Sequence, residues 1–353
     1  MKRRHIDLAL QGGGTHGAFT WGVLDRLLED ERLQFDAVSG SSAGAMNAVA
    51  LAAGWAEGGR KGAREVLRRF WSRVADRLQL AQWAGPWLGG TSMLPASPLS
   101  MALDMASSWL ASGGGNPLRT VLQEEVDFDA VRRCSAIQLF IGATHVRSGR
   151  LRVFRREEID VDAVLASACL PLLFPAVVID GEAYWDGGYM GNPSLVPLLN
   201  ESAARDLLLV QVHPSERQAL PVTPSAIVDR INEIGFHGSL VKELRSLAIL
   251  QQLMREEGLD GERCHTPLLR KAHGLRVHRI EGGEQLDPLA TPGPLQTPWH
   301  HLLDLHRAGH AAAEGWLQAN YTHLGRHGTV DLVAEYLDDS GPGPRSNPPR
   351  STP

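Results

Sequence analysis

The first 53 residues contain two strand–loop–helix units in direct succession, and this pattern constrains the fold more than any other feature of the chain. The apolar run 6–10 predicts a buried strand, a glycine-rich loop follows it, and residues 16–28 repeat apolar positions at helical spacing. Residues 35–38 and 45–53 repeat the arrangement around a second loop of small residues. Consecutive units of this kind are typical of a parallel sheet flanked by helices, so we expect an α/β fold.

Further apolar runs extend this organisation along the chain. They predict strands at 136–143, 151–154, 176–179 and 207–212, and after residue 212 long amphipathic helices at 227–257 and 299–321. We therefore expect one domain with a core at 1–214 and a helical C-terminal part at 215–337. Residues 338–353 are rich in Pro, Ser and Gly, a composition that predicts disorder.

The segment 80–117 differs from its surroundings and has the composition of an apolar insertion. Its only charge is Asp104, among many Gly, Pro and Ser, and its large apolar side chains are Trp83, Trp87, Trp109, Met93, Met101 and Met105. Two interpretations remain open. The segment is either a lid that touches lipid or a cap packed over the core, because both would place apolar side chains beside a polar rim.

Charge and cysteine content restrict the partners and the compartment. The chain has 35 basic and 40 acidic residues, a net charge of -5 without long runs of either sign, so we expect no nucleic acid partner. Cys134, Cys169 and Cys264 are widely separated and match no metal-ligand spacing, which favours a reducing, cytoplasmic location. No apolar stretch approaches the roughly 18 residues of a membrane span, and the one near the N-terminus is too short for a signal peptide.

The second loop carries a candidate nucleophile. Gly40-Ser41-Ser42-Ala43-Gly44 fits the pattern G-x-S-x-G and lies between a predicted strand and a predicted helix. A serine on such a sharp turn projects its oxygen away from the sheet, and the dipole of the following helix favours negative charge there. The alternative is a tight turn of small residues without chemistry.

The glycine-rich loop at residues 11–17 offers backbone N–H groups close to a helix N-terminus. Such groups hold either the oxyanion of a tetrahedral intermediate or the phosphate of a nucleotide. Gly12, Gly14 and Gly17 also satisfy the dinucleotide pattern G-x-G-x-x-G. However, no acidic residue ends the second strand to hold a ribose, because the serine loop occupies that place. The oxyanion interpretation is therefore favoured.

Asp186 is a candidate base for the serine. Asp186-Gly187-Gly188 is first a turn signature, but a serine needs a proton acceptor to act as a nucleophile. The usual acceptor is histidine. An ordinary α/β-hydrolase places its serine after several strands, whereas the serine loop at position 42 follows only one predicted strand. The late histidines lie on or beside a polar helix face, where solvation is the common outcome: His300, His301, His306, His310 and His323.

The order of these motifs resembles the patatin-like phospholipase family. The glycine loop ending in Gly17, the serine loop and Asp186-Gly187 follow one another as in that family, and a stretch before the aspartate matches as well, namely Ala166-Ser167-Ala168 with Pro171 and Phe174-Pro175. The resemblance extends over about residues 6–214 and implies a three-layer α/β/α fold with a mostly parallel central sheet and a helical C-terminal extension.

The resemblance also implies a mechanism. Ser42 would attack the carbonyl of a lipid ester while Asp186 takes its proton, Gly12, Gly13 and Gly14 would form the oxyanion hole, and no metal or cofactor would be needed. The product of the first step would be an acyl-enzyme. Peripheral membrane contact is an expectation that rests on the apolar insertion. Two alternatives remain. The chain could hydrolyse another acyl ester, such as a storage polyester or a thioester, or it could have a non-catalytic lipid-binding or regulatory role. The sequence leaves the oligomeric state open.

Two features of the site distinguish this chain. A carboxylate has a pKa near 4 in water, so Asp186 needs surroundings that raise it, which Tyr184, Trp185 and Tyr189 are placed to provide. Where the family usually has Arg or Lys before the last loop glycine, this chain has His16, whose charge depends on pH. Activity could then be weaker, pH-dependent or absent.

Overall fold

A computed structural model describes residues 3–88, 116–171, 174–217, 220–259, 263–283, 286 and 298–337. Within this part of the chain, eight strands form one sheet: β1 Arg4–Leu10, β2 Leu33–Gly40, β3 Gln138–His145, β4 Arg150–Arg155, β5 Val177–Ile179, β6 Glu182–Asp186, β7 Asp206–Gln211 and β8 Arg276–Glu281. Their order is β5-β6-β3-β2-β1-β7-β8, and β4 also pairs with β3.

The sheet is mostly parallel, as the sequence predicts. The neighbours β3, β2, β1, β7 and β8 run parallel, whereas β4 and β6 pair with β3 in the antiparallel sense and β5 pairs with β6 in the same way. In the register of β1 and β2, Leu10 lies opposite Gly40. The loops that follow these two strands therefore begin side by side at one edge of the sheet.

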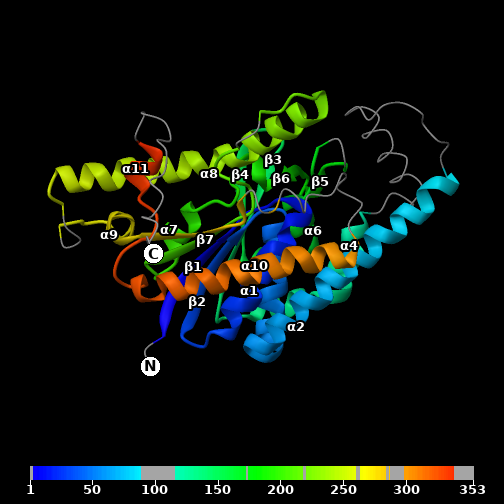
Figure 1. Cartoon of the computed structure of the whole chain (residues 1–353), viewed down its shortest axis with the longest axis horizontal. Helices are drawn as coiled ribbons and strands as arrows, with labels where there is room; N and C mark the ends of the chain where they lie inside the picture. The colour runs from blue at the N-terminus through cyan, green and yellow to red at the C-terminus, as the bar shows by residue number, and fades with distance from the viewer. Residues whose placement is uncertain are drawn as a thin grey trace, which may run out of the picture.

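Helices cover both faces of the sheet, so the fold is a three-layer α/β/α arrangement (Figure 1). One layer includes α1 Gly17–Glu29, α2 Ala43–Leu88, α4 Pro117–Glu125, α6 Val161–Ser167 and α10 Trp299–Asn320; the other includes α7 Val196–Glu201, α8 Pro224–Glu256, α9 Pro267–Gly274 and α11 Leu332–Tyr336. The short helix α5 Phe128–Arg133 and the 3-10 turns complete the described elements: η1 Gly14–His16, η2 Arg156–Glu158, η3 Gly187–Tyr189 and η5 Tyr321–His323.

Successive side chains of the central strands point alternately into two hydrophobic cores, one on each face of the sheet. In β7, Leu208 and Val210 join the core with α1, α2 and α10, whereas Leu207 and Leu209 join the core with α8 and α9. All four side chains are at most 1% exposed. Successive strand residues point to opposite faces, so a continuous apolar run is what a strand covered on both faces requires.

Most of the predicted elements are confirmed, and two strands were missed. β6 lies within what the sequence suggested was only a turn, and β8 belongs to the C-terminal part that was predicted to be helical. Helix α2 continues to Leu88, with non-helical backbone at Gly58 and Gly59. Most of the predicted insertion at 80–117, and the predicted tail at 338–353, lie outside the described residues. No described helix combines the length and apolarity that crossing a bilayer requires.

Helices α1 and α10 touch backbone to backbone at two glycines. A Cβ added to Gly22 would lie 2.0 Å from the carbonyl oxygen of His306, and one added to Gly309 would lie 2.0 Å from the carbonyl oxygen of Phe19. Neither position has room for a methyl group. This contact holds the C-terminal helix against the helix that follows the glycine loop.

We predict that Gly309→Ala lowers the free energy of unfolding by about 1–3 kcal/mol, because the added methyl group forces the two helices apart. Gly315→Ala is the matched control on the same helix, since nothing lies within 4 Å of its added Cβ. It should raise stability by up to about 1 kcal/mol through helix propensity. Urea unfolding of both variants checks the pair, and equal stabilities would contradict the close contact.

Candidate active site

Ser42 lies on a strained turn between β2 and α2. Its φ is 54°, a left-handed value that it shares with only Asp180 among the described non-glycine residues. Such a backbone conformation costs about 1–3 kcal/mol and persists only where the surroundings enforce it. The Ser42 N–H donates a hydrogen bond to Ser167 Oγ at 3.0 Å, so the turn is fixed from the end of α6.

The two flanking glycines allow the turn to approach its neighbours. A Cβ on Gly44 would lie 2.1 Å from the carbonyl oxygen of Leu10, and one on Gly40 would lie 2.6 Å from the carbonyl oxygen of Gly44. A side chain at Gly44 would push the serine turn away from β1, and one at Gly40 would open the turn itself. The glycines of G-x-S-x-G are therefore required here by close packing.

Asp186 ends strand β6 and is completely buried. Its N–H donates to the carbonyl oxygen of Cys169 at 2.8 Å, and its own carbonyl oxygen accepts from Thr144 Oγ1 at 2.8 Å. The carboxylate Oδ1 accepts from the N–H of Gly188 at 2.8 Å. Oδ2 is buried and has no hydrogen-bond partner of ordinary geometry among the described residues. The backbone is therefore fixed on both sides while one carboxylate oxygen remains available.

Burial raises the pKa of Asp186 to about 7, against the opposing effects of the Gly188 N–H and the Ser42 hydroxyl. The hydroxyl is close enough to stabilise the charged carboxylate, so the fold brings the two predicted catalytic residues together. Burial likewise raises the pKa of the Cys169 thiol to about 11, and the charge of Asp186 contributes to that shift. Near neutral pH the carboxyl group can thus both accept and release a proton.

The aromatic neighbours of Asp186 differ in their exposure. Tyr184 is buried, and Trp185 is partly buried. Tyr189 is 41% exposed, and its ring contacts Phe236 of α8 with centroids 4.7 Å apart. Because a Cβ on Gly188 would also collide with the Phe236 ring, α8 covers the turn that follows Asp186. The sequence named the aromatic side chains near the carboxylate but not this contribution from α8.

The glycine loop lies directly against Ser42. A Cβ on Gly12 would lie 2.7 Å from Ser42 Cβ, so only glycine fits there. The N–H of Gly12 already donates to Asn192 Oδ1 at 2.7 Å. Gly12 would have to exchange this partner to donate to an oxyanion, so the oxyanion role of Gly12, Gly13 and Gly14 stays a prediction. Within the described residues, the N–H groups of Gly13 and Gly14 make no hydrogen bond to the protein.

Several side chains that sequence reasoning missed hold this loop in place. Asn192 is fully buried and lies 180 residues from Gly12 in the chain, so no local pattern links them. Gln11 is also fully buried, and its Oε1 accepts the N–H groups of Val212 and His213 at 2.9 and 3.0 Å. Asn192 ties the loop to the segment between η3 and α7, and Gln11 ties it to the end of β7. The only sequence feature that pointed to these contacts was the polar residue Gln11 directly after an apolar strand.

The histidine that departs from the family pattern lies in the 3-10 turn η1. His16 is near His213, whose ring nitrogen Nε2 would be 3.2 Å from a Cβ on Gly13. Burial, with a smaller contribution from the neighbouring His16, lowers the pKa of His213 to about 4. His213 is therefore neutral near pH 7, and the loop is bordered there by imidazole groups instead of a permanent cation.

Comparison with known proteins identifies the family. The model of the family described as patatin-like phospholipase matches residues 8–199, a range that contains Ser42 and Asp186. No curated protein matches the chain in sequence. Among solved structures, VipD from Legionella pneumophila is similar at 14% identity and a TM-score of 0.42, with 90% of this chain and 67% of that chain covered.

Two further solved structures are similar at low identity. The type III effector protein ExoU matches at 17% identity and a TM-score of 0.35, over 90% of this chain and 53% of that chain. A structure of the heterodimeric complex ExoU-SpcU from the type III secretion system of Pseudomonas aeruginosa matches at 15% identity and a TM-score of 0.30, over 95% of this chain and 75% of that chain.

We predict that Asp186→Asn stabilises the protein more at pH 8 than at pH 5. The pKa of Asp186 is raised to about 7 in the folded state, whereas an aspartate in the unfolded chain has a pKa near 4. Ionising the buried carboxyl group therefore costs stability, and this cost grows as the pH rises from about 4 to about 7. The stability difference between variant and wild type should widen by about 2–3 kcal/mol between these two pH values.

Urea unfolding at both pH values measures this difference. The exposed Asp180 provides the control, because Asp180→Asn removes a carboxylate that is not desolvated. If the difference in unfolding free energy between Asp186→Asn and wild type does not change with pH, burial does not hold the pKa of Asp186 at a raised value.

Proposed function

The chain belongs to the patatin-like phospholipase family, and from this premise we propose that it hydrolyses carboxylic esters of lipids through Ser42 and Asp186. The family places it among lipid acyl hydrolases. One observation carries the assignment of the two residues. A fully buried carboxyl group with a pKa raised to about 7 lies beside a serine on a strained strand-to-helix turn.

The proposed first step transfers the acyl group to the enzyme. Ser42 Oγ attacks the ester carbonyl carbon as Asp186 Oδ2 accepts the hydroxyl proton. The carbonyl oxygen becomes the oxyanion of a tetrahedral intermediate, to which the N–H groups of Gly13 and Gly14 donate. The intermediate collapses, the alcohol leaves with the proton from Asp186, and an acyl-enzyme remains on Ser42.

The proposed second step regenerates the enzyme. Asp186 takes a proton from water, the resulting hydroxide attacks the acyl-enzyme, and the same oxyanion site holds the second intermediate. The proton returns to Ser42 as the fatty acid leaves. A carboxylate alone can play both roles because its pKa of about 7 lies within the operating range of a general base and a general acid.

The proposed chemistry does not select the alcohol part of the substrate. The dyad acts on the acyl group, so phospholipids, lysophospholipids, storage polyesters and thioesters all suit the chemistry. We favour a lipid because the family match covers Ser42, Asp186 and the glycine loop together. A panel of phospholipid, monoacylglycerol, polyester and thioester substrates ranks them by kcat/KM.

We predict that kcat/KM for a short-chain p-nitrophenyl ester rises with pH through a midpoint near 7, since Asp186 must be deprotonated to act as a base. Ser42→Ala and Asp186→Asn should each reduce kcat by roughly 10²- to 10⁴-fold. Mass spectrometry after fluorophosphonate treatment should find one adduct, on Ser42, that forms more slowly in Asp186→Asn.

A folded wild type that takes no adduct and turns over no ester would contradict the hydrolase assignment. It would favour the non-catalytic alternative, in which His16 and its neighbours have disabled the site. Lipid binding without turnover would then be the remaining function to measure. Far-ultraviolet circular dichroism of each variant shows whether loss of activity reflects unfolding.

Membrane contact has a candidate surface on α8. Ile227, Ile231 and Ile234 follow one another at helical spacing and are 42%, 62% and 55% exposed. Phe236, two residues after Ile234, packs against Tyr189, so this segment of α8 runs beside the candidate site while the apolar stripe lies on another face of the helix. We propose that the stripe inserts into the surface of the lipid aggregate that contains the substrate.

We predict that Ile231→Ser with Ile234→Ser weakens sedimentation with phosphatidylcholine vesicles, while hydrolysis of a water-soluble ester is retained. Each large apolar side chain contributes about 1.5–3 kcal/mol when it is fully buried. Ile249→Ser with Leu253→Ser is the matched control, because both residues are exposed near the other end of α8. Equal vesicle binding by both double variants would exclude the proposed surface.

A further inference from the structure

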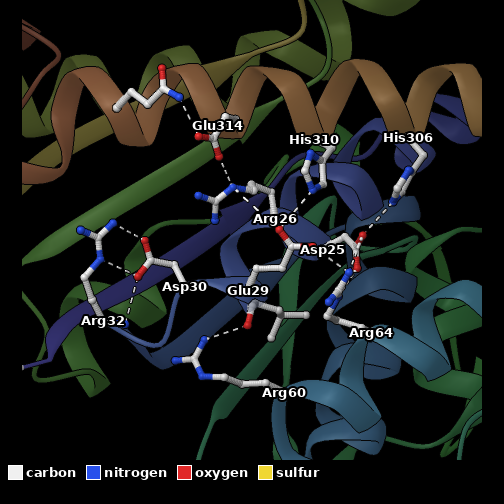
Figure 2. Close-up of polar contacts among 12 residues, drawn as sticks. Asp25, Arg26, Glu29, Asp30, Arg32, Arg60, Arg64, His306, His310 and Glu314 are labelled. Carbon is white, nitrogen blue, oxygen red and sulfur yellow. Dashed lines mark hydrogen bonds and ion pairs between the residues drawn. The ribbon is translucent and has the colours of Figure 1, made fainter.

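Two pairs of potential metal ligands face one another where α1 crosses α10. Asp25 and Glu29 are four residues apart on α1, and His306 and His310 are four residues apart on α10, so each pair shares one helix face. Figure 2 shows the two imidazole rings directed from α10 toward the two carboxylates of α1. The backbone contact at Gly309 holds the helices at this short separation.

The distances between these groups are close to those of a metal centre. His306 Nε2 lies 3.2 Å from Asp25 Oδ2, and His310 Nε2 lies 3.4 Å from Glu29 Oε2. One ligand atom from each of Asp25, Glu29 and His310 lies within 4.8 Å of the other two. Ligand atoms around a tetrahedral zinc ion are about 3.4 Å apart, because each bond is about 2.0–2.2 Å long. His306 lies outside this group of three, so a site of four ligands requires its side chain to rotate toward the others.

We propose that Asp25, Glu29, His306 and His310 bind a divalent transition-metal ion of the zinc type, which joins α1 to α10. Two imidazole nitrogens and two carboxylate oxygens form a donor set that suits this class of ion. Histidines at i and i+4 on one helix face are a recurring way to provide two of the four ligands.

Arg64 of α2 binds mainly the carboxylate oxygens that face away from the imidazoles. Its Nε donates to Asp25 Oδ1 at 2.6 Å and its Nη2 to Glu29 Oε1 at 2.8 Å, whereas its contact with Asp25 Oδ2 is longer, at 3.3 Å. Outer hydrogen bonds of this kind orient metal-binding carboxylates. Arg64 therefore fixes the orientation of both carboxylates from α2, on the side away from α10 (Figure 2).

The local charge also favours a cation. With neutral imidazoles, the two carboxylates carry two negative charges and Arg64 returns one positive charge. Arg26 is bound to Glu314, and its Nε also lies 3.9 Å from Glu29 Oε2, so an ion would share that oxygen with a more distant guanidinium. Surface hollows reach the cluster from two sides, one lined by Asp25 and His306 and the other by Glu29 and His310. Both hollows give water and ions access to the ligands.

The site is independent of the proposed reaction. Both histidines lie beyond residue 199, outside the region that the family model matches. The ion would connect the C-terminal helix to α1, the helix that follows the glycine loop, and would thereby stabilise the fold. Its binding is therefore testable in Ser42→Ala, which lacks the proposed nucleophile.

Isothermal titration of zinc chloride into the chelator-treated full-length protein tests the proposal, with thermal unfolding in the presence and absence of zinc as a second readout. We expect one equivalent to bind and the melting temperature to rise. His310→Ala and Glu29→Gln should each weaken binding by at least about tenfold and abolish the rise. Both side chains are partly or fully exposed, so the variants should fold.

The control is His300→Ala, which removes an exposed histidine from the same helix and should bind zinc like wild type. Two results would overturn the proposal. One is the absence of stoichiometric zinc binding by wild type, in which case the cluster acts only as a set of ion pairs between the helices. The other is binding that His310→Ala and Glu29→Gln leave unchanged.

Discussion

The complete burial of the Asp186 carboxyl group is the constraint on which the candidate site depends. Removing a carboxylate from water disfavours its charged form, and this effect moves the pKa of Asp186 from an acidic value to about 7. The left-handed backbone conformation of Ser42 is a second feature of the site that costs conformational free energy. Neither feature stabilises the fold. Both are enforced by a sheet whose central strands are covered on both faces.

The strand order explains how distant residues meet. β1 and β2 are neighbours, so the glycine loop after β1 lies beside the serine turn after β2. β6 lies on the far side of β3 and delivers Asp186 opposite Ala143 in an antiparallel register. Ser167, at the end of α6, then fixes the N–H of Ser42. The site is therefore assembled at one edge of a single sheet by residues from four separate segments.

The features predicted from sequence are those whose cause is local. The serine turn and the glycine loop each combine small residues with an adjacent strand and helix, so their positions are visible within a few residues. Asn192 contacts Gly12 across 180 residues, and no local pattern links the two. Ser167 lies in a stretch that resembles the family, but that stretch does not show its hydrogen bond to Ser42 across 125 residues. Strand β8 contains only two apolar residues, Val277 and Ile280, which are too few to mark a strand beside a helical region, and its pairing with β7 defines it. Asp25 of α1 and His306 of α10 are separated by 281 residues, so only the packing of the two helices brings them together.

The central claim is that burial holds Asp186 half-protonated near neutral pH. Carbon-13 NMR of protein labelled at aspartate side-chain carboxyl carbons measures this directly, with Asp186→Asn used to assign the resonance. We predict that the Asp186 carboxyl signal titrates with a pKa of about 7. A signal that titrates near 4, like an aspartate in water, would contradict the account, because the carboxyl group would then be an ordinary solvated acid and a poor base for Ser42.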